Sequence, residues 1–212
     1  MRLDHVSYVA SHDQISDVVN RIGSQIGTAF VDGGIHPKFG TRNFTAPLLN
    51  GQYIEVVCPM DHPATDSTPF GRAVRNKAEE GGGWLAWVVA VKDIREIEEK
   101  IGRSAIEGTR RRPDGTELKW KQVGLLDTIN NAQKPYFIEW LTPNHPSKDG
   151  KPSFEISRIE LQNENDENFE VLDLQLNNII PQLKLIQHLQ NSKSSTINVV
   201  AFTDGSRTTS VE

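Results

Sequence analysis

The sequence is poor in cysteine, in positive charge and in long apolar runs. Cys58 is the single cysteine among 212 residues, so no disulfide can form within the chain, and a reducing compartment is indicated. The formal net charge of −5 and the pI near 5.7 argue against nucleic-acid binding, because phosphate contacts need a basic surface. The mean hydropathy of −0.48 and the lack of a long apolar run exclude a membrane span.

The first ten residues, MRLDHVSYVA, also lack the basic and apolar stretches of a secretory signal. We therefore predict a cytoplasmic chain with no nucleic-acid partner and no membrane partner. Its length allows one sizeable core or two small units fused into one.

One stretch of the chain occurs twice. HPKFGT at residues 36–41 corresponds to RPDGT at residues 112–116. The tripeptides YIE and FIE, which end at Glu55 and Glu139, are each followed four residues later by a proline and then by an HP dipeptide. We interpret the stretch as one structural unit used twice, and we place the functional site where the two copies face each other.

The spacing of apolar residues predicts the same order of elements in both copies: strand, helix, strand, strand, strand. In the first copy, residues 1–63, strands are expected at 3–10, 28–31, 41–49 and 52–58, and a helix at 15–22 ending at Gly23. In the second copy, residues 84–147, strands are expected at 84–91, 105–112, 117–124 and 136–141, a helix at 94–101, and a loop at 127–134. The connector, residues 64–83, contains a helix at 70–80 and ends in three glycines.

Residues 152–212 resemble a third, shortened copy. A strand is expected at 155–161, a helical stretch interrupted by Pro181 at 169–189, and a hairpin at 197–203 and 208–211. The predicted fold class is α+β, with two tandem βαβββ units forming a curved mixed-sheet cup. A βαββ-like carboxy-terminal unit packs on the cup and covers an open sheet edge.

Several segments resemble the vicinal oxygen chelate superfamily, which includes glyoxalases, bleomycin-resistance proteins and dioxygenases. They are LDHVSYVA, GGIHPKFGTRN, YIEVV, RRRPDGTELKW and PYFIEW, and they look most like the glyoxalase-like branch. The resemblance covers residues 1–147. It implies a cup with metal ligands early on the first strand and in the middle of the fourth strand of each unit.

Carried over by position, the resemblance places these four ligand positions at His5, Glu55, Leu85 and Glu139. Leu85 comes opposite His5 when the helix starts of the two copies are aligned, and it cannot bind a metal. The other three side chains suit one divalent ion (Zn, Ni, Fe or Mn) with open positions for substrate or water. The ion would act as a Lewis acid, and Glu55 or Glu139 would be the catalytic carboxylate that moves a proton.

Both glutamates lie in apolar strands. Glu55 shares its strand face with Tyr53, and Glu139 shares its face with Phe137. Because these faces are apolar, we expect both carboxylates to point into the cup, where each needs a partner. The alternative is an outward, solvated position.

Three more residues, His36, Arg42 and Asn43, are candidate substrate-binding groups at the mouth of the cup, or else loop and edge residues. The three arginines at 110–112 either grip an anionic substrate or form a solvated strand face. The four tryptophans are expected mostly in the core, with one or two lining a pocket.

Three functions follow from these patterns. The first is a metal-dependent isomerase, lyase or dioxygenase acting on a small oxygenated or carbonyl compound. The second is a non-catalytic protein that sequesters a small molecule in the same cup without metal, which the apolar Leu85 favours. The third is a homodimer or partner module in which the cup is structural.

Overall fold

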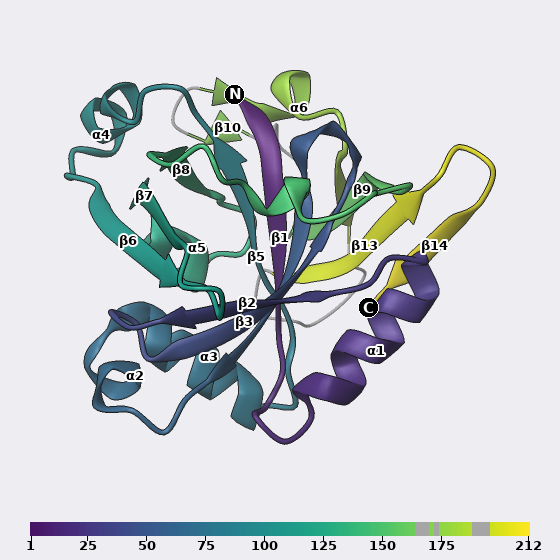
Figure 1. Cartoon of the computed structure of the whole chain (residues 1–212). Coiled ribbons are helices and arrows are strands. Elements are labelled where there is room, and N and C mark those ends of the chain that lie inside the picture. Colours follow the sequence, from purple (N-terminus) through teal and green to yellow (C-terminus); the bar gives the residue numbers. More distant parts are fainter. Residues whose placement is uncertain (164–169, 172–173, 188–195) are drawn as a thin grey trace.

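The computed structural model (Figure 1) describes residues 1–163, 170–171, 174–187 and 196–212. It is an α+β structure, as predicted, and strand–helix–strand–strand–strand units follow one another along the chain. The first unit consists of β1 (Arg2–Val9), α1 (Ile15–Ile26), β2 (Val31–His36), β3 (Thr41–Pro47) and β4 (Tyr53–Pro59). The second consists of β5 (Gly83–Ala90), α4 (Arg95–Ile101), β6 (Ile106–Arg111), β7 (Glu117–Val123), α5 (Leu125–Asn130) and β8 (Tyr136–Trp140).

Three local predictions were wrong. Helix α1 continues through Gly23 and ends at Gly27, whose φ of 64° is the left-handed conformation that glycine adopts at low cost. Strand β2 lies at residues 31–36 and not at 28–31. Helix α5 replaces the first part of the loop expected at 127–134.

The curved mixed sheet closes into a barrel with the strand order β1-β4-β3-β2-β6-β7-β8-β5. On one side the units are joined by the antiparallel pair β1–β5, which is registered from Arg2 to Val9. On the other side, β2 and β6 share one registered pair, Ile35 with Arg111. At this seam Gly34 has a φ of 92°, and a Cβ there would lie 1.9 Å from the Arg111 carbonyl oxygen, so the approach of the two strands requires glycine.

The two units have the same strand register around the pocket. In the parallel pair β1–β4, His5 lies beside Tyr53, and in the parallel pair β5–β8, Val88 lies beside Tyr136. Both pairs have the same offset of 48 residues along the chain, which leaves the shift between the units open. Tyr53 and Tyr136 are 83 residues apart, and so are the helix-capping residues His62 and His145, so we align the two units with a difference of 83.

This register corrects the alignment made from the sequence. The structural counterpart of His5 is Val88 and not Leu85. The counterpart of Glu55 is Ile138 and not Glu139. The sequence alignment slipped because strand pairing, and not the position of the helix start or of a glutamate, decides which residues are equivalent.

Buried apolar residues form two layers, one on each side of the barrel wall. The layer inside the barrel includes Val57, Val88 and Ile138. The larger outer layer includes Trp87 and Phe137, which pack under α1, α4 and the carboxy-terminal sheet. Successive residues of a strand thus go to different layers, as the two-residue period of a strand requires.

The connector forms two helices, α2 (Pro63–Ser67) and α3 (Pro69–Glu79). Phe70 and Val74 of α3 join the layer inside the barrel, beside Phe39, and so cover one end of it. The repeated HP dipeptides have a structural role. His62 and His145 each accept a hydrogen bond from the backbone N–H two residues later and so cap the short helical turns that follow.

The carboxy-terminal strands form a separate four-stranded sheet in the order β12-β9-β13-β14. The described elements are β9 (Glu155–Asn163), β10 (Glu170–Val171), β11 (Leu174–Gln175), α6 (Leu176–Ile179), β12 (Leu183–Gln187), β13 (Ile197–Thr203) and β14 (Thr208–Val211). The predicted first strand and hairpin are confirmed. The helical stretch expected at 169–189 is confirmed at α6 (Leu176–Ile179) and is wrong at β10, β11 and β12, where the alternating sequence LKLIQ pairs with β9 as β12.

This sheet packs on the outer wall of the barrel, and not on an open edge, since the barrel is closed. The indole Nε1 of Trp84 donates to the carbonyl of Val211 at 2.9 Å. The backbone N–H of Leu49 donates to the carbonyl of Phe154 at 2.8 Å. The domain boundary at residues 147–152 stays a prediction.

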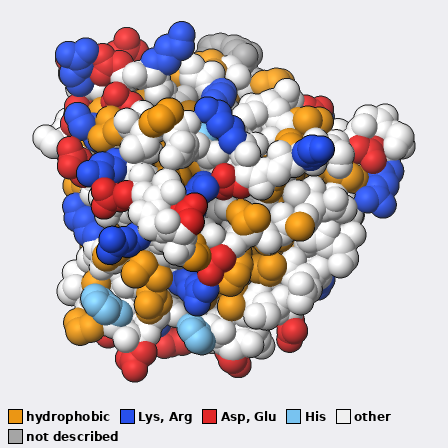
Figure 2. Space-filling view, in the orientation of Figure 1, with side chains coloured by type: hydrophobic (Ala, Val, Ile, Leu, Met, Phe, Trp, Pro, Cys, Tyr) orange, Lys and Arg blue, Asp and Glu red, His pale blue; other side chains and the backbone are white. Residues whose placement is uncertain are grey.

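In the described part of the chain, none of the helices is long and apolar enough to pass through a lipid bilayer. Figure 2 shows acidic and basic side chains interspersed on the face it displays, with no single basic surface.

Candidate functional site

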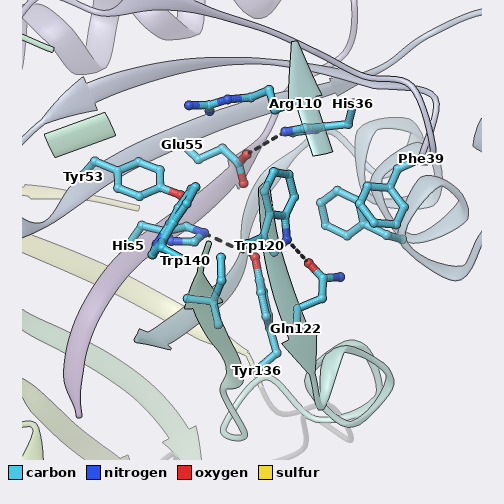
Figure 3. Close-up of a pocket in the computed structure, with 12 residues that line it drawn as sticks. His5, His36, Phe39, Tyr53, Glu55, Arg110, Trp120, Gln122, Tyr136 and Trp140 are labelled. Carbon is cyan, nitrogen blue, oxygen red and sulfur yellow. Dashed lines mark hydrogen bonds and ion pairs between the residues drawn. The ribbon is translucent and has the colours of Figure 1, made fainter. Parts of the chain in front are cut away.

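A pocket lies inside the barrel and is lined by both units (Figure 3). Its cavity volume is about 30 Å³, within about 420 Å³ of space between the lining atoms that includes the part open to solvent. Four side chains that carry or accept protons line it: His5, His36, Glu55 and Arg110. Most of the rest of the lining is aromatic.

Glu55 is the buried carboxylate of the pocket, with 5% of its surface exposed. Its two oxygens accept hydrogen bonds of 2.7 Å, one from the Ser7 hydroxyl and one from the Asn43 amide. Burial raises the pKa of Glu55, but nearby His36 and His5 and these two donors outweigh it and hold the pKa below its ordinary value. Glu55 is therefore ionised at neutral pH, pointing inward as expected.

His36 stands next to this carboxylate and is neutral. Its Nδ1 lies 2.9 Å from the Thr41 hydroxyl, and its Nε2 lies 4.0 Å from an oxygen of Glu55. Burial lowers the pKa of His36 to about 4, and the opposing effect of Glu55 does not offset it. The pocket thus presents an ionised carboxylate beside an uncharged imidazole.

His5 is held in place from several directions. Its Nδ1 lies 3.0 Å from a carboxylate oxygen of Asp4, its Nε2 lies 3.3 Å from the Tyr136 hydroxyl, and its ring stacks on Tyr53 at 4.3 Å. When Nδ1 keeps its proton and donates it in a hydrogen bond to the Asp4 carboxylate, Nε2 carries no proton and can accept one in the pocket. Asp4 thereby selects the tautomer and the orientation of His5.

Asp4 is fully buried and connects distant parts of the chain. Besides His5, it accepts hydrogen bonds from the Trp140 indole at 3.1 Å and from His145 at 3.2 Å. Burial raises the pKa of Asp4, but the bonds from His145 and His5 hold it well below its ordinary value. Asp4 is an anion that positions three rings around the pocket.

The second unit supplies the cation, Arg110, and one phenol, Tyr136, while the other phenol, Tyr53, lies on β4 of the first unit. Arg110 is 2% exposed, and burial lowers its pKa without removing its charge. Burial also raises the pKa of Tyr53 and Tyr136 well above the ordinary value, so both phenols keep their protons. They can donate hydrogen bonds to a ligand oxygen.

The structure brings together four of the six site residues predicted from the sequence: His5, His36, Glu55 and Asn43. Asn43 faces inward through its bond to Glu55. Arg42 lies on the outer face of β3, where it pairs with Asp32 and stacks over Phe44.

Glu139 is also outside the pocket, and the expectation that it points inward was wrong. Its carboxylate accepts a 3.0 Å hydrogen bond from the backbone N–H of Ile94, at the start of α4. The reason is strand alternation, since Ile138 and Trp140, on either side of it, take the pocket face.

The sequence did not identify Asp4, Tyr53 and Tyr136 as site residues. It also did not identify Trp140 and His145 as the partners of Asp4. Two signals were present, because Tyr53 lies two residues before Glu55, and Tyr136 two before Ile138, on the same strand faces. Asp4 had no such signal. A register shift between Leu3 and His5 in the β1–β5 pair breaks the simple alternation and allows adjacent residues to meet.

The fit of a metal ion can be judged from the donors present. His5, His36 and Glu55 share the pocket, but both oxygens of Glu55 already accept hydrogen bonds, and the counterpart positions Val88 and Ile138 have no donor. Among the described residues, no three His, Cys, Asp or Glu side chains are grouped so as to hold a metal ion. As placed, the residues do not fit a metal centre.

The chain belongs to the glyoxalase-like domain family, whose model matches residues 3–172. This agrees with the resemblance to the glyoxalase-like branch seen in the sequence. No match was found among curated proteins.

Two solved structures are similar to this chain. A hypothetical protein from Staphylococcus aureus has 18% sequence identity and a TM-score of 0.57, covering 77% of this chain and 70% of that one, and this likeness concerns the fold alone. A methylmalonyl-CoA epimerase from Streptomyces coelicolor has 14% identity and a TM-score of 0.46, covering 67% of this chain and 99% of that one.

Proposed function

We propose that this protein is an isomerase or lyase that moves a proton on a small carbonyl compound bound in the barrel. One observation carries the proposal: an ionised carboxylate, Glu55, faces a mostly aromatic pocket beside a neutral imidazole and protonated phenols. Such a set of groups with different protonation states is what acid–base chemistry at neutral pH requires.

In the proposed reaction, Glu55 takes a proton from the carbon next to the substrate carbonyl. The electron pair of that C–H bond moves to form the C=C bond of an enolate, and the carbonyl oxygen gains the negative charge. The Tyr53 hydroxyl donates a hydrogen bond to that oxygen, and the Tyr136 hydroxyl does so when its single proton turns from His5 Nε2 to the substrate. Return of the proton to a different atom completes an isomerisation, and loss of a neighbouring group completes an elimination.

His5 is the second proton acceptor of the proposal. Asp4 fixes its tautomer so that Nε2 faces the pocket, where it also holds the Tyr136 hydroxyl. In this scheme His5 either orients that phenol or accepts a hydroxyl proton from the substrate. Asp4 is a positioning residue that acts through His5.

Deuterium exchange tests the proposal without knowledge of the natural substrate. The protein is incubated in deuterated water with a panel of small ketones, aldehydes and 2-oxo acids, and mass spectrometry follows exchange at the carbon next to the carbonyl. Glu55→Gln is expected to lower the catalysed rate by about 10²–10⁴-fold. Glu139→Gln is the matched control, since it makes the same change one face away, and is expected to keep the wild-type rate.

Equal exchange rates for Glu55→Gln and wild type would show that Glu55 does not take the proton from the substrate. The divalent ion predicted from His5, Glu55 and Glu139 stays a prediction, tested by the metal content of the purified protein. About one equivalent that is lost in His5→Ala would establish it.

A second candidate function is non-catalytic binding of a small molecule. It is favoured by the apolar residues Val88 and Ile138 at the positions that correspond to His5 and Glu55. Binding of a panel compound without exchange, and equally by Glu55→Gln, would support it.

A further inference from the structure

Arg110 is a buried cation that has no anionic side chain paired with it in the described residues. It is 2% exposed and lines the pocket, yet its Nε and Nη2 atoms have no hydrogen-bond partner. No ion pair of the described residues involves Arg110. By contrast, Arg112, two residues along the same segment, makes two hydrogen bonds to Asp149 at 2.9 and 2.6 Å. A buried guanidinium left without partners needs a physical reason.

The surrounding chain makes room for this side chain. A Cβ on Gly33 would lie 3.1 Å from Nη1 of Arg110 and 2.2 Å from the Asn43 side-chain oxygen. A Cβ on Gly108 would lie 2.3 Å from the ring of Trp120. Gly33 thus leaves space for the guanidinium and Gly108 leaves space for the indole, so the position of Arg110 is built into the backbone.

The nearest carboxylate does not neutralise Arg110. Glu55 attracts it, but the two form no ion pair, and both Glu55 oxygens are occupied by Ser7 and Asn43. The guanidinium therefore keeps two N–H-bearing nitrogens for something that enters the pocket. In Figure 3 the Arg110 side chain lies above Glu55 on the polar side of the pocket, across from the phenol of Tyr136.

We propose that Arg110 binds the carboxylate of a small organic acid, and that the substrate is a 2-oxo or 2-hydroxy carboxylic acid. The planar guanidinium matches a carboxylate through two parallel hydrogen bonds. Trp120 and Trp140, whose rings are 5.7 Å apart, give an apolar surface for the remainder of the acid. The assignment of the reaction rests on the proposed function, whereas the binding of a carboxylate does not.

Binding is tested with benzoate and its neutral analogue benzamide, which have the same ring and nearly the same shape. The side-chain Nε–H resonance of Arg110, assigned by its loss in Arg110→Met, is followed by NMR during each titration. Benzoate is expected to shift this resonance in a saturable way, and benzamide is expected to leave it unchanged. No shift with benzoate up to tens of millimolar would overturn the proposal.

Two variants separate binding from folding. Arg110→Met removes the charge at similar length, and Arg111→Met makes the same change at the exposed neighbour. Arg110→Met is expected to lose benzoate binding and to keep or raise the unfolding temperature of the ligand-free protein, because an unpaired buried cation is removed. Arg111→Met is expected to bind benzoate as wild type does. A lower unfolding temperature in Arg110→Met together with unchanged binding would make Arg110 structural.

Exchange measurements distinguish this proposal from the preceding one. Wild type is expected to exchange the methyl protons of pyruvate faster than those of pyruvamide, and Arg110→Met is expected to lose that difference. Benzoate binding at Arg110 without exchange of any 2-oxo acid would contradict the proton-transfer function and leave the carboxylate site standing. Exchange that depends on Glu55, but is equally fast for pyruvate and pyruvamide, would support the proton-transfer function and contradict the carboxylate site at Arg110.

Discussion

The two units of the barrel have the same strand register but contribute different side chains to the pocket. The first unit places His5 and Glu55 where the second places Val88 and Ile138. The second unit instead supplies a cation and aromatic rings, among them Arg110. The comparison teaches that a repeated scaffold can draw the proton-accepting groups of a pocket from one unit and its buried cation from the other.

The largest effect is expected from placing a carboxylate on the apolar wall. Ile138 is 2% exposed and packs among other apolar residues of the inner layer. Ile138→Glu is expected to lower the free energy of unfolding by about 3–5 kcal/mol at neutral pH, because the new carboxylate has no donors like Ser7 and Asn43. Urea unfolding measures the change, with Ile138→Leu as the control. Equal stability of the two variants would show that both walls accept a carboxylate.

The polar wall is expected to respond to pH through His36. Burial lowers the pKa of His36 to about 4 from 6.5, so as the pH falls below 6.5 the unfolded chain takes up the proton first. The stability contributed by the neutral imidazole is complete above pH 6.5 and is lost as the pH falls toward 4. Over that window wild type is expected to lose roughly 3 kcal/mol more than His36→Gln, measured by urea unfolding at each pH. Parallel curves would contradict a buried neutral His36.

The seam between the units is expected to be sensitive at Gly34. Gly34→Ala combines a positive φ with a clash against the Arg111 carbonyl, and we expect a loss of about 2 kcal/mol in the free energy of unfolding. Gly115→Ala is the matched control, because Gly115 has a φ of 85° but no atom within 4 Å of the added Cβ. Equal losses in the two variants would mean that the close approach of β2 and β6 costs nothing.

The smallest effect is expected on the outer face of the barrel. Glu139→Ala removes the acceptor of the Ile94 N–H and is expected to cost about 1 kcal/mol, as the loss of a helix cap does. The affinity for a carboxylate probe is expected to stay at the wild-type value. If Glu139→Ala changed the affinity for the carboxylate probe and left the free energy of unfolding unchanged, Glu139 would be a residue of the binding site.

Much of the fold was predictable because it depends on local patterns. The bounds of most elements in both units were predicted to within a few residues. The predictions came from the alternation of apolar residues in β1 and β4 and from the helical spacing before Gly102. The inward orientation of Glu55 followed from its apolar strand. These features depend on neighbours in sequence, which a single chain displays.

What could not be predicted depends on strand pairing. Glu139 resembles Glu55 in sequence context, yet a register difference of one residue puts it on the other face. Arg110 looked like its exposed neighbours, and its burial follows from the two-residue period together with the closure of the barrel. In the carboxy-terminal part, LKLIQ was misread because Pro181 suggested an interrupted helix and not a turn before a strand.

Asp4 has a consequence for the order in which the molecule matures. It is made among the first residues of the chain, but its partners Trp140 and His145 are made more than 130 residues later. Until then, of its partners in the folded protein, Arg2 and His5 are the ones already present. The pocket is therefore completed late in synthesis, and a chain truncated before residue 140 lacks two of the side chains that hold Asp4, the residue that orients His5.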